Sequence, residues 1–233
     1  KYDEKKDPYL TVTPKWDFQK EAREIFINKK NGVLQMATGT GKTRTALGIV
    51  SELLNKKLIN KIIIQMYGES LQKQWFDEIN KEWLDSRRSK EQIRILKAYE
   101  QPSLIDQFIG NYNNKESIDL IIVSKSKLSR LLSGIRDFEK EKCIIIHDEV
   151  HDLFSKGNVN EIKGLQKDIK YRLGLSATAE FDEEVSEEHK LRNQNLYNEV
   201  GPIIYNFEIE HAIERGVLVE FNFIPLNYEL NRK

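Results

Sequence analysis

The residues best suited to chemistry lie in one short stretch, residues 36–43, which reads Met-Ala-Thr-Gly-Thr-Gly-Lys-Thr. Its glycines, Gly39 and Gly41, let backbone N–H groups converge on an anion, and a helix beginning after the loop presents its positive end to the same point. Lys42 is then placed to reach the outer phosphates of a nucleotide, and the Thr43 hydroxyl to bind Mg²⁺. The stretch therefore predicts a phosphate-binding loop.

The context of this loop supports the prediction. The usual pattern, G-x-x-x-x-G-K-[ST], has glycine where this chain has Met36. An apolar run at 32–36 nevertheless predicts a strand before the loop. Apolar residues recur at helical spacing after it: Ala46, Leu47, Val50, Leu53 and Leu54. A simple turn followed by a helix cap is the alternative, and the strand, loop and helix order argues against it.

Two further polar clusters, Asp148-Glu149 and Ser176 with Thr178, each follow an apolar run. The carboxyl ends of parallel strands share one edge of a sheet, where ligands bind, so the clusters and the loop can share a crevice. Asp148 is then placed to hold Mg²⁺ opposite Thr43, and Glu149 to polarise an attacking water. Two acids can also merely cap a strand or helix, and it is the phosphate loop that favours the catalytic interpretation.

The elements that position these residues alternate along the chain. Apolar runs predict strands at 32–36, 61–65, 93–96, 120–123, 143–146 and 172–175. Amphipathic helices are predicted between them, with apolar faces such as Phe18, Ala22, Ile25 and Phe26, or Leu71, Trp75, Ile79 and Trp83. This alternation is typical of an α/β fold, a mostly parallel β-sheet with helices on both faces.

Composition bounds the function. The 233 residues suffice for one large α/β domain. Lys+Arg 37 balance Asp+Glu 37, so a nucleic-acid surface must be a local patch. The lone cysteine, Cys143, excludes an internal disulfide framework and is expected in the core. The sequence contains neither a bilayer-spanning run nor a signal peptide, which favours a cytoplasmic protein without a membrane partner. Because the chain begins with Lys1, we expect a fragment of a longer protein.

Three motifs carry a resemblance to a known family. Residues 37–43, 148–151 (Asp-Glu-Val-His) and 176–178 (Ser-Ala-Thr) resemble motifs I, II and III of superfamily-two DExH helicases and translocases. The resemblance covers residues 16–226 and is closest to the motor subunits of restriction enzymes, the type III, Res-like branch. It implies a RecA-like P-loop NTPase domain at 14–226, after an N-terminal extension at 1–13. Residues 227–233 would begin the linker to a second RecA-like domain.

The resemblance also implies residue roles. A family glutamine upstream of motif I reads adenine, and Gln19 matches its position, while Trp16, Phe18 and Lys15 are candidates to cover the base. A helix-surface glutamine is the alternative. His147 is expected to be structural. The implied ATP-binding residues are Gln19, Thr38, Gly39, Thr40, Gly41, Lys42 and Thr43. The implied Mg²⁺ ligands are Thr43 and Asp148, the catalytic residues Lys42, Asp148, Glu149 and His151, and the coupling residues Ser176 and Thr178.

The nucleic-acid motifs match less closely. Leu71 and Gln74-Trp75 fit motif Ia, but its proline is absent. Ser70 and Gln74 are candidate nucleic-acid contacts, although Ser70 at a helix start is better suited to capping. Ser124, followed by lysines, resembles the next backbone-contacting motif, and a solvated loop explains those lysines equally well.

We therefore expect the ATP-binding motor domain of a nucleic-acid-dependent ATPase, a DNA helicase or translocase of the kind found in restriction and defence systems. The family favours DNA over RNA and suggests a nuclease or methyltransferase partner. Without the second domain's arginine finger, worth roughly 10³–10⁵ in rate, ATP hydrolysis by the chain alone should be weak. A P-loop switch that remodels protein partners and an idle binding module are the alternatives.

Overall fold

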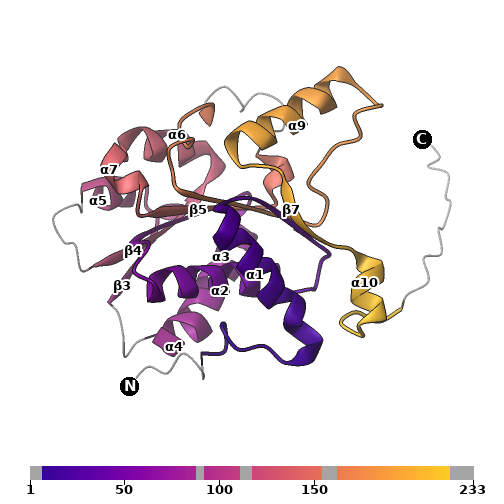
Figure 1. The fold of residues 1–233 in the computed structure, drawn as a ribbon. Helices are drawn as coiled ribbons and strands as arrows, with labels where there is room; N and C mark the ends of the chain where they lie inside the picture. Colours follow the sequence, from indigo (N-terminus) through magenta and orange to yellow (C-terminus); the bar gives the residue numbers. More distant parts are fainter. Residues whose placement is uncertain (1–6, 88–91, 111–116, 154–161, 221–233) are drawn as a thin grey trace, which may run out of the picture.

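The computed structural model describes residues 7–87, 92–110, 117–153 and 162–220 of the chain (Figure 1). In these residues, seven strands form one parallel sheet in the order β3-β4-β2-β5-β6-β1-β7. The strands are β1 (Asn31–Met36), β2 (Lys61–Met66), β3 (Ile93–Lys97), β4 (Ile118–Ser124), β5 (Cys143–Asp148), β6 (Tyr171–Ser176) and β7 (Ile203–Phe207).

The central strands form where apolar residues run without interruption. Ile62, Ile63 and Ile64 of β2 lie in register with the three isoleucines that follow Cys143 in β5, and all of them are buried. A strand covered on both faces needs such a run, because neither face meets water. The six predicted strands are confirmed, with ends displaced by at most two residues. Strand β7, at the edge beside β1, was not predicted.

Helices cover both faces of the sheet, as predicted (Figure 1). One layer contains α1 (Asp17–Lys29), α2 (Lys42–Asn55), α3 (Glu69–Glu78), a π-helical turn (Ile79–Trp83) and α4 (Leu84–Arg87). The other contains α5 (Leu104–Gly110), α6 (Lys125–Gly134), α7 (Asp137–Lys140) and α9 (Glu187–Glu199). Strand side chains alternate between the layers: Ile62 and Ile64 face the first and Ile63 the second. Cys143 is buried in the core, as predicted.

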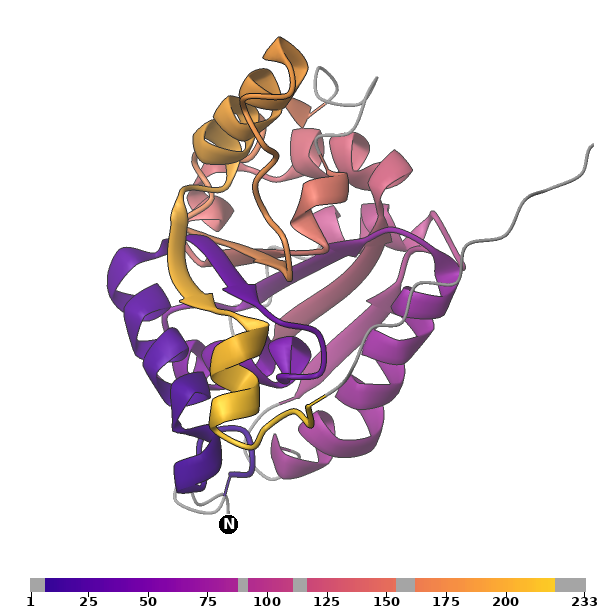
Figure 2. The same cartoon turned by 90° about the vertical axis from the view of Figure 1, so that its right-hand side faces the viewer.

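Both ends of the described chain pack on the face of the sheet that α1 and α2 cover. Helix α10 (Ile209–Glu214) lies beside α1 at the β7 edge (Figure 2), and the Arg215 guanidinium bonds the Asp17 carboxylate at the start of α1. At the other end, Asp7 and Tyr9 of the predicted N-terminal extension are each only 2% exposed, so this part of the extension is packed against the domain. Residues 1–6 and the predicted linker at 227–233, with its boundary at 226, lie outside the described residues.

Within the described ranges, no helix combines the length and the apolar character needed to cross a bilayer.

Candidate active site

The phosphate loop joins β1 to α2 and depends on its glycines. Gly39 has φ 84° and Gly41 φ 83°, a conformation that costs glycine little. A Cβ atom on Gly41 would lie 2.4 Å from Nε2 of Gln19 and would also be strained by the positive φ, so a larger residue would displace Gln19. Thr40 is fully buried and donates its hydroxyl to the Ala37 carbonyl oxygen at 2.6 Å. Its backbone N–H is directed to the same carbonyl oxygen, at 3.3 Å, so Thr40 holds the loop in shape.

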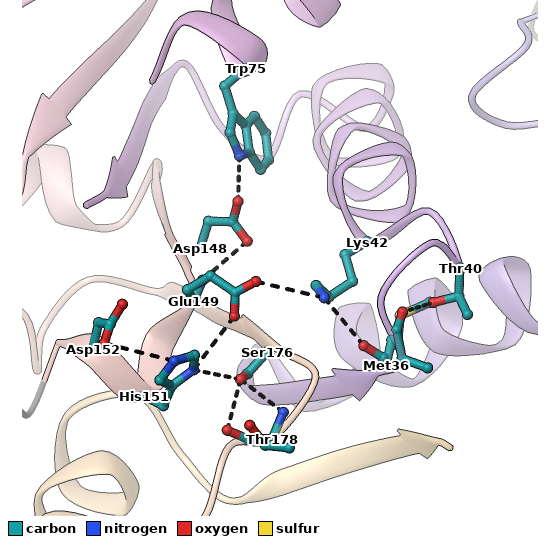
Figure 3. Close-up of polar contacts among 11 residues, drawn as sticks. Met36, Thr40, Lys42, Trp75, Asp148, Glu149, His151, Asp152, Ser176 and Thr178 are labelled. Atoms are coloured by element: carbon teal, nitrogen blue, oxygen red, sulfur yellow. Dashed lines mark hydrogen bonds and ion pairs between the residues drawn. The ribbon is translucent and has the colours of Figure 1, made fainter. Parts of the chain in front are cut away.

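Lys42, the first residue of α2, reaches across the carboxyl edge of the sheet (Figure 3). Its Nζ lies 3.4 Å from the Met36 carbonyl oxygen and 3.8 Å from Oε1 of Glu149. The second distance exceeds a normal hydrogen bond, so the two charges attract each other across a gap. An anion inserted there would gain the lysine as a partner, which is the arrangement that binding of a phosphate requires.

Asp148 ends β5 and is nearly buried. Its carboxylate accepts hydrogen bonds from the Trp75 indole N–H at 2.7 Å and from the Glu149 backbone N–H at 3.1 Å. Burial raises the pKa of Asp148, and the Trp75 hydrogen bond and the Lys42 charge oppose that rise. A buried carboxylate with two donors still carries a charge that a cation would stabilise. The Asp148 carboxylate therefore has the oxygen chemistry that Mg²⁺ prefers, and Thr43, the second residue of α2, carries a hydroxyl oxygen.

Glu149 has a left-handed backbone, with φ 49°. For a residue other than glycine this conformation costs on the order of 1–3 kcal/mol and is found mostly where a side chain must be aimed precisely. The turn sends the chain directly into a 3₁₀ helix, Val150–Asp152, and brings His151 beside the acid. Oε2 of Glu149 lies 3.5 Å from Nδ1 of His151.

His151 connects the second polar cluster to the third. Its Nδ1 lies 2.9 Å from Oγ of Ser176, and Ser176 in turn donates to the Thr178 carbonyl oxygen at 2.9 Å and accepts from the Thr178 N–H at 3.1 Å (Figure 3). Gln35 in β1 holds the same turn by accepting from the Ala179 N–H at 2.9 Å. The three polar clusters therefore lie together at the carboxyl edge of the sheet, linked by the Lys42–Glu149 ion pair and the His151–Ser176 contact.

His147, the other histidine near this edge, is structural, as predicted. Its ring is fully buried between Gln65 and Gln166, at 2.7 and 2.8 Å from their side-chain oxygens. Burial lowers its pKa to about 4, so the ring is neutral in the neutral pH range.

Gln19 lies under the phosphate loop. It is 3% exposed and donates to the Thr40 carbonyl oxygen at 3.0 Å, so the helix-surface alternative is wrong. Beside it is a cavity of about 390 Å³ lined by Trp16, Gln19, both loop glycines, Thr11–Thr13 and Arg44. Of the three candidates to cover a base, Trp16 lines this cavity, whereas Phe18 is buried and stacked on Phe207. The Lys15 amine lies over the Trp16 ring.

The candidate nucleic-acid residues fall into two separate hollows. Ser70 and Gln74 line one of about 430 Å³, with Lys73, Lys81, Asp77, Glu78 and Glu82. Ser124 lines another of about 310 Å³, with Tyr67, Gly68, Glu69, Lys125 and Lys127. Ser70 is not a helix cap, because α3 is capped at Gly68 without a side-chain hydrogen bond. The structure therefore leaves Ser70 exposed and does not bring it together with Ser124.

Several residues of the site were not assigned roles from the sequence. Trp75 was expected only to pack in the core, Gln35 as part of a strand, and Arg44 had no assigned role. The Gln-Trp pair of motif Ia was a signal for Trp75. A single glutamine or arginine carries no comparable signal, because its role depends on which distant element lies opposite.

Fold and site together define a RecA-like P-loop ATPase, with a phosphate loop, an acidic pair and a Ser-Ala-Thr turn at one sheet edge. The family described as "Type III restriction enzyme, res subunit" matches residues 15–181, and the chain belongs to that family. It is an ATPase motor domain of the superfamily-two helicase and translocase type.

Individual relatives agree. Over 194 residues the chain is 29% identical to the DNA 3'-5' translocase XPB2 of Sulfurisphaera tokodaii, covering 83% of this chain and 36% of that protein. It is 23% identical over 206 residues to the endonuclease subunit of a type I restriction enzyme of Staphylococcus aureus, covering 87% and 20%. The fold resembles that of the Type ISP restriction-modification enzyme LlaGI, solved with a DNA substrate mimic, with TM-score 0.57, 17% identity, and 89% and 21% coverage. The chain thus spans about a third or less of each relative's length.

Proposed function

We propose that the chain is the first motor domain of an ATP-driven DNA translocase or helicase. The observation that carries the proposal is the contact between three polar clusters at one sheet edge: Lys42 to Glu149 at 3.8 Å, and His151 to Ser176 at 2.9 Å. Such contacts allow the state of a nucleotide at the loop to reach the Ser-Ala-Thr turn.

In this proposal the loop backbone at residues 38–43 and Lys42 bind the phosphates of ATP, and Gln19 recognises the adenine edge. Thr43 and Asp148 hold Mg²⁺, which when bound neutralises charge on the phosphates. The carboxylate of Glu149, held toward Lys42 by its left-handed backbone, orients the attacking water.

His151 then serves as the link between hydrolysis and movement. It lies within reach of both Glu149 and Ser176, at 3.5 and 2.9 Å. A change in the position of Glu149 would alter the hydrogen bonds of Ser176 and, through them, the Thr178 turn. We propose that this turn passes the nucleotide state to the nucleic-acid track and to a second RecA-like domain of the same protein.

The hollow beside Ser124 suits a nucleic-acid backbone better than the one beside Ser70. Two lysines and one glutamate line the former, whereas two lysines and three carboxylates line the latter. Lys127 donates to the Ala98 and Tyr99 carbonyl oxygens, which orient its ammonium group without cancelling its charge. We propose DNA as the track, with Ser124 as a phosphate contact and Ser70 and Gln74 as secondary ones. A nuclease or methyltransferase partner and a cytoplasmic location complete the proposal.

The test is ATP turnover by the protein including its second motor domain, with duplex DNA, single-stranded DNA or RNA, using Lys42→Ala as the blank. Stimulation by DNA is expected, and the most effective polymer identifies the track. Stimulation by RNA alone would mean that the track is RNA and not DNA. If nucleotide binds but no polymer stimulates turnover, the protein-remodelling switch becomes the better explanation.

A further inference from the structure

Residues 7–13, which we call the N-terminal strap, lie just before the span that the family model matches. The strap is fixed at several points by arginines from different helices. Arg23 of α1 donates to the Tyr9 and Leu10 carbonyl oxygens, each at 3.2 Å. Arg44 of α2 donates to the Pro8 carbonyl oxygen at 2.5 Å. Arg87 of α4 lies 3.7 Å from the Asp7 carboxylate, with both side chains fully buried.

The sequence of α2 also makes room for the strap. Gly48 lies in the middle of this helix, where glycine is normally unfavourable. A Cβ atom at this position would lie 2.6 Å from the Tyr9 carbonyl oxygen, too close for the strap to stay in place. The absence of a side chain at Gly48 therefore lets the strap backbone lie directly on α2.

The strap forms part of the cavity beside the phosphate loop. Thr11, Val12 and Thr13 line it together with Trp16, Gln19 and Arg44. The Arg44 guanidinium lies 4.8 Å from the centre of the Tyr9 ring, a cation–π geometry. Arg44 is thus held between the strap and the cavity, with its planar group available to cover a nucleobase.

Tyr9 connects this wall to another helix. Its hydroxyl donates to Glu78 of α3 at 2.8 Å. Burial and the neighbouring Glu78 carboxylate raise the pKa of Tyr9, so the hydroxyl stays protonated at neutral pH. Helix α3 also carries Trp75, the donor to Asp148, and Ser70 and Gln74, the candidate nucleic-acid contacts. The Tyr9 side chain therefore contacts Arg44, a residue that lines the cavity, through its ring and contacts α3 through its hydroxyl.

We propose that Arg44 covers the base of a bound nucleoside triphosphate and that Tyr9 is a positioning residue, which orients Arg44 and couples occupancy of the cavity to α3. The inference rests on the proposed function, since it assumes a nucleotide at the phosphate loop. It goes beyond that function by making the strap part of the nucleotide site. When a base stacks on Arg44, the guanidinium, the Tyr9 ring and Glu78 become more firmly held together.

The first experiment measures the affinity of the 233-residue chain for Mg·ATP and for inorganic triphosphate, which has no base. Arg44→Ala should weaken ATP binding about tenfold, the size of a partly desolvated cation–π contact, and leave triphosphate binding unchanged. Gly48→Ala, which alters no residue of the cavity, should have the same selective effect by displacing the strap. Gly110→Ala is the matched control, because a Cβ there meets no atom within 4 Å. Lys42→Ala should weaken the binding of both Mg·ATP and triphosphate.

The second experiment measures amide hydrogen exchange in α3 with and without a non-hydrolysable ATP analogue. The analogue should slow exchange in α3 of the wild-type chain. Tyr9→Phe keeps the ring beside Arg44 and loses only the bond to Glu78, so the slowing in α3 should be lost. A purely structural hydroxyl would change exchange equally with and without nucleotide.

The outcomes separate this inference from the proposed function. Unchanged ATP affinity in Arg44→Ala, or equal slowing of α3 in Tyr9→Phe, would overturn the inference and leave the proposed function standing. Triphosphate binding that survives Lys42→Ala would instead count against the phosphate loop and the proposed function. A wild-type chain that binds neither ligand would overturn both.

Discussion

Buried charges gather at both ends of the sheet, but they are arranged differently. At the amino end, Lys61 of β2 donates to the Phe108 carbonyl oxygen at 2.6 Å and lies 3.2 Å from Glu139 and 4.0 Å from Asp119. Arg94 makes a two-pronged contact with Asp119, at 2.9 and 3.0 Å. Each charge there has an oppositely charged partner within 4.0 Å, although Oε1 of Glu139 makes no hydrogen bond to any described residue.

At the carboxyl end the charges are left partly unsatisfied. Lys42 and Glu149 stay 3.8 Å apart, Glu149 has a strained backbone, and burial raises the pKa of Asp148. Burial of charge alone therefore does not identify a functional site, because structural ion pairs are buried too. What distinguishes the site is that its charges lie beside the phosphate loop and include a carboxylate on a left-handed backbone, Glu149.

The largest effect is expected from Glu149→Gln in the protein that includes its second motor domain. The amide keeps the shape of the side chain but cannot accept a proton from water, so ATP turnover should fall roughly 10²–10⁴-fold. Phosphate release measures turnover, and nucleotide affinity should stay within about threefold of wild type. Glu24→Gln, on the exposed surface of α1, is the control. Unchanged turnover would indicate an idle binding module.

At the other end of the sheet, Lys61→Met should reduce the free energy of unfolding by about 3–5 kcal/mol, because it leaves buried Glu139 and Asp119 without their shared cation. Urea denaturation measures this loss, and Lys20→Met, at an exposed position of α1, should change stability little. ATP affinity of the folded variant should match wild type. A stable Lys61→Met variant with impaired nucleotide binding would reverse the roles assigned to the two ends.

Two buried tryptophans in the same layer of helices allow a site residue to be compared with one that only stabilises the fold. Trp75 donates to the Asp148 carboxylate at 2.7 Å, and Trp83 donates to the Ser51 hydroxyl at 2.8 Å. Trp75→Phe should cost about 1–3 kcal/mol of stability, since it removes a donor from a buried charge, and should raise the Mg²⁺ concentration needed for half-maximal turnover. Trp83→Phe should lose stability but keep the Mg²⁺ dependence of the wild type. Equal Mg²⁺ dependence in the two variants would show that Trp75 does not influence the proposed Mg²⁺ site.

The two edges of the sheet differ in how much of them the sequence could predict. The strands and the three motifs could be predicted because each is encoded by a short stretch of sequence. Three successive isoleucines, for example, predict a buried strand whatever the rest of the chain does. Contacts made by one side chain across long separations did not follow. The bonds from Trp75 to Asp148 and from Tyr9 to Glu78 join residues 73 and 69 positions apart, and no local pattern encodes such pairs. Strand β7 was missed because its residues are only half buried at a sheet edge.

The smallest effect is expected at Ser176, whose hydroxyl bonds both His151 and the Thr178 backbone. Ser176→Ala should cost about 1 kcal/mol of stability, the usual value of one hydrogen bond, and leave turnover without nucleic acid near wild type. If the turn passes on the nucleotide state, stimulation by DNA should nevertheless fall severalfold, because allosteric coupling of 1–3 kcal/mol corresponds to roughly 5–150-fold. Ser51→Ala, which loses a buried hydroxyl of similar size, should keep full stimulation. Equal stimulation in both variants would mean that Ser176 only stabilises the carboxyl edge, as Lys61 stabilises the amino edge.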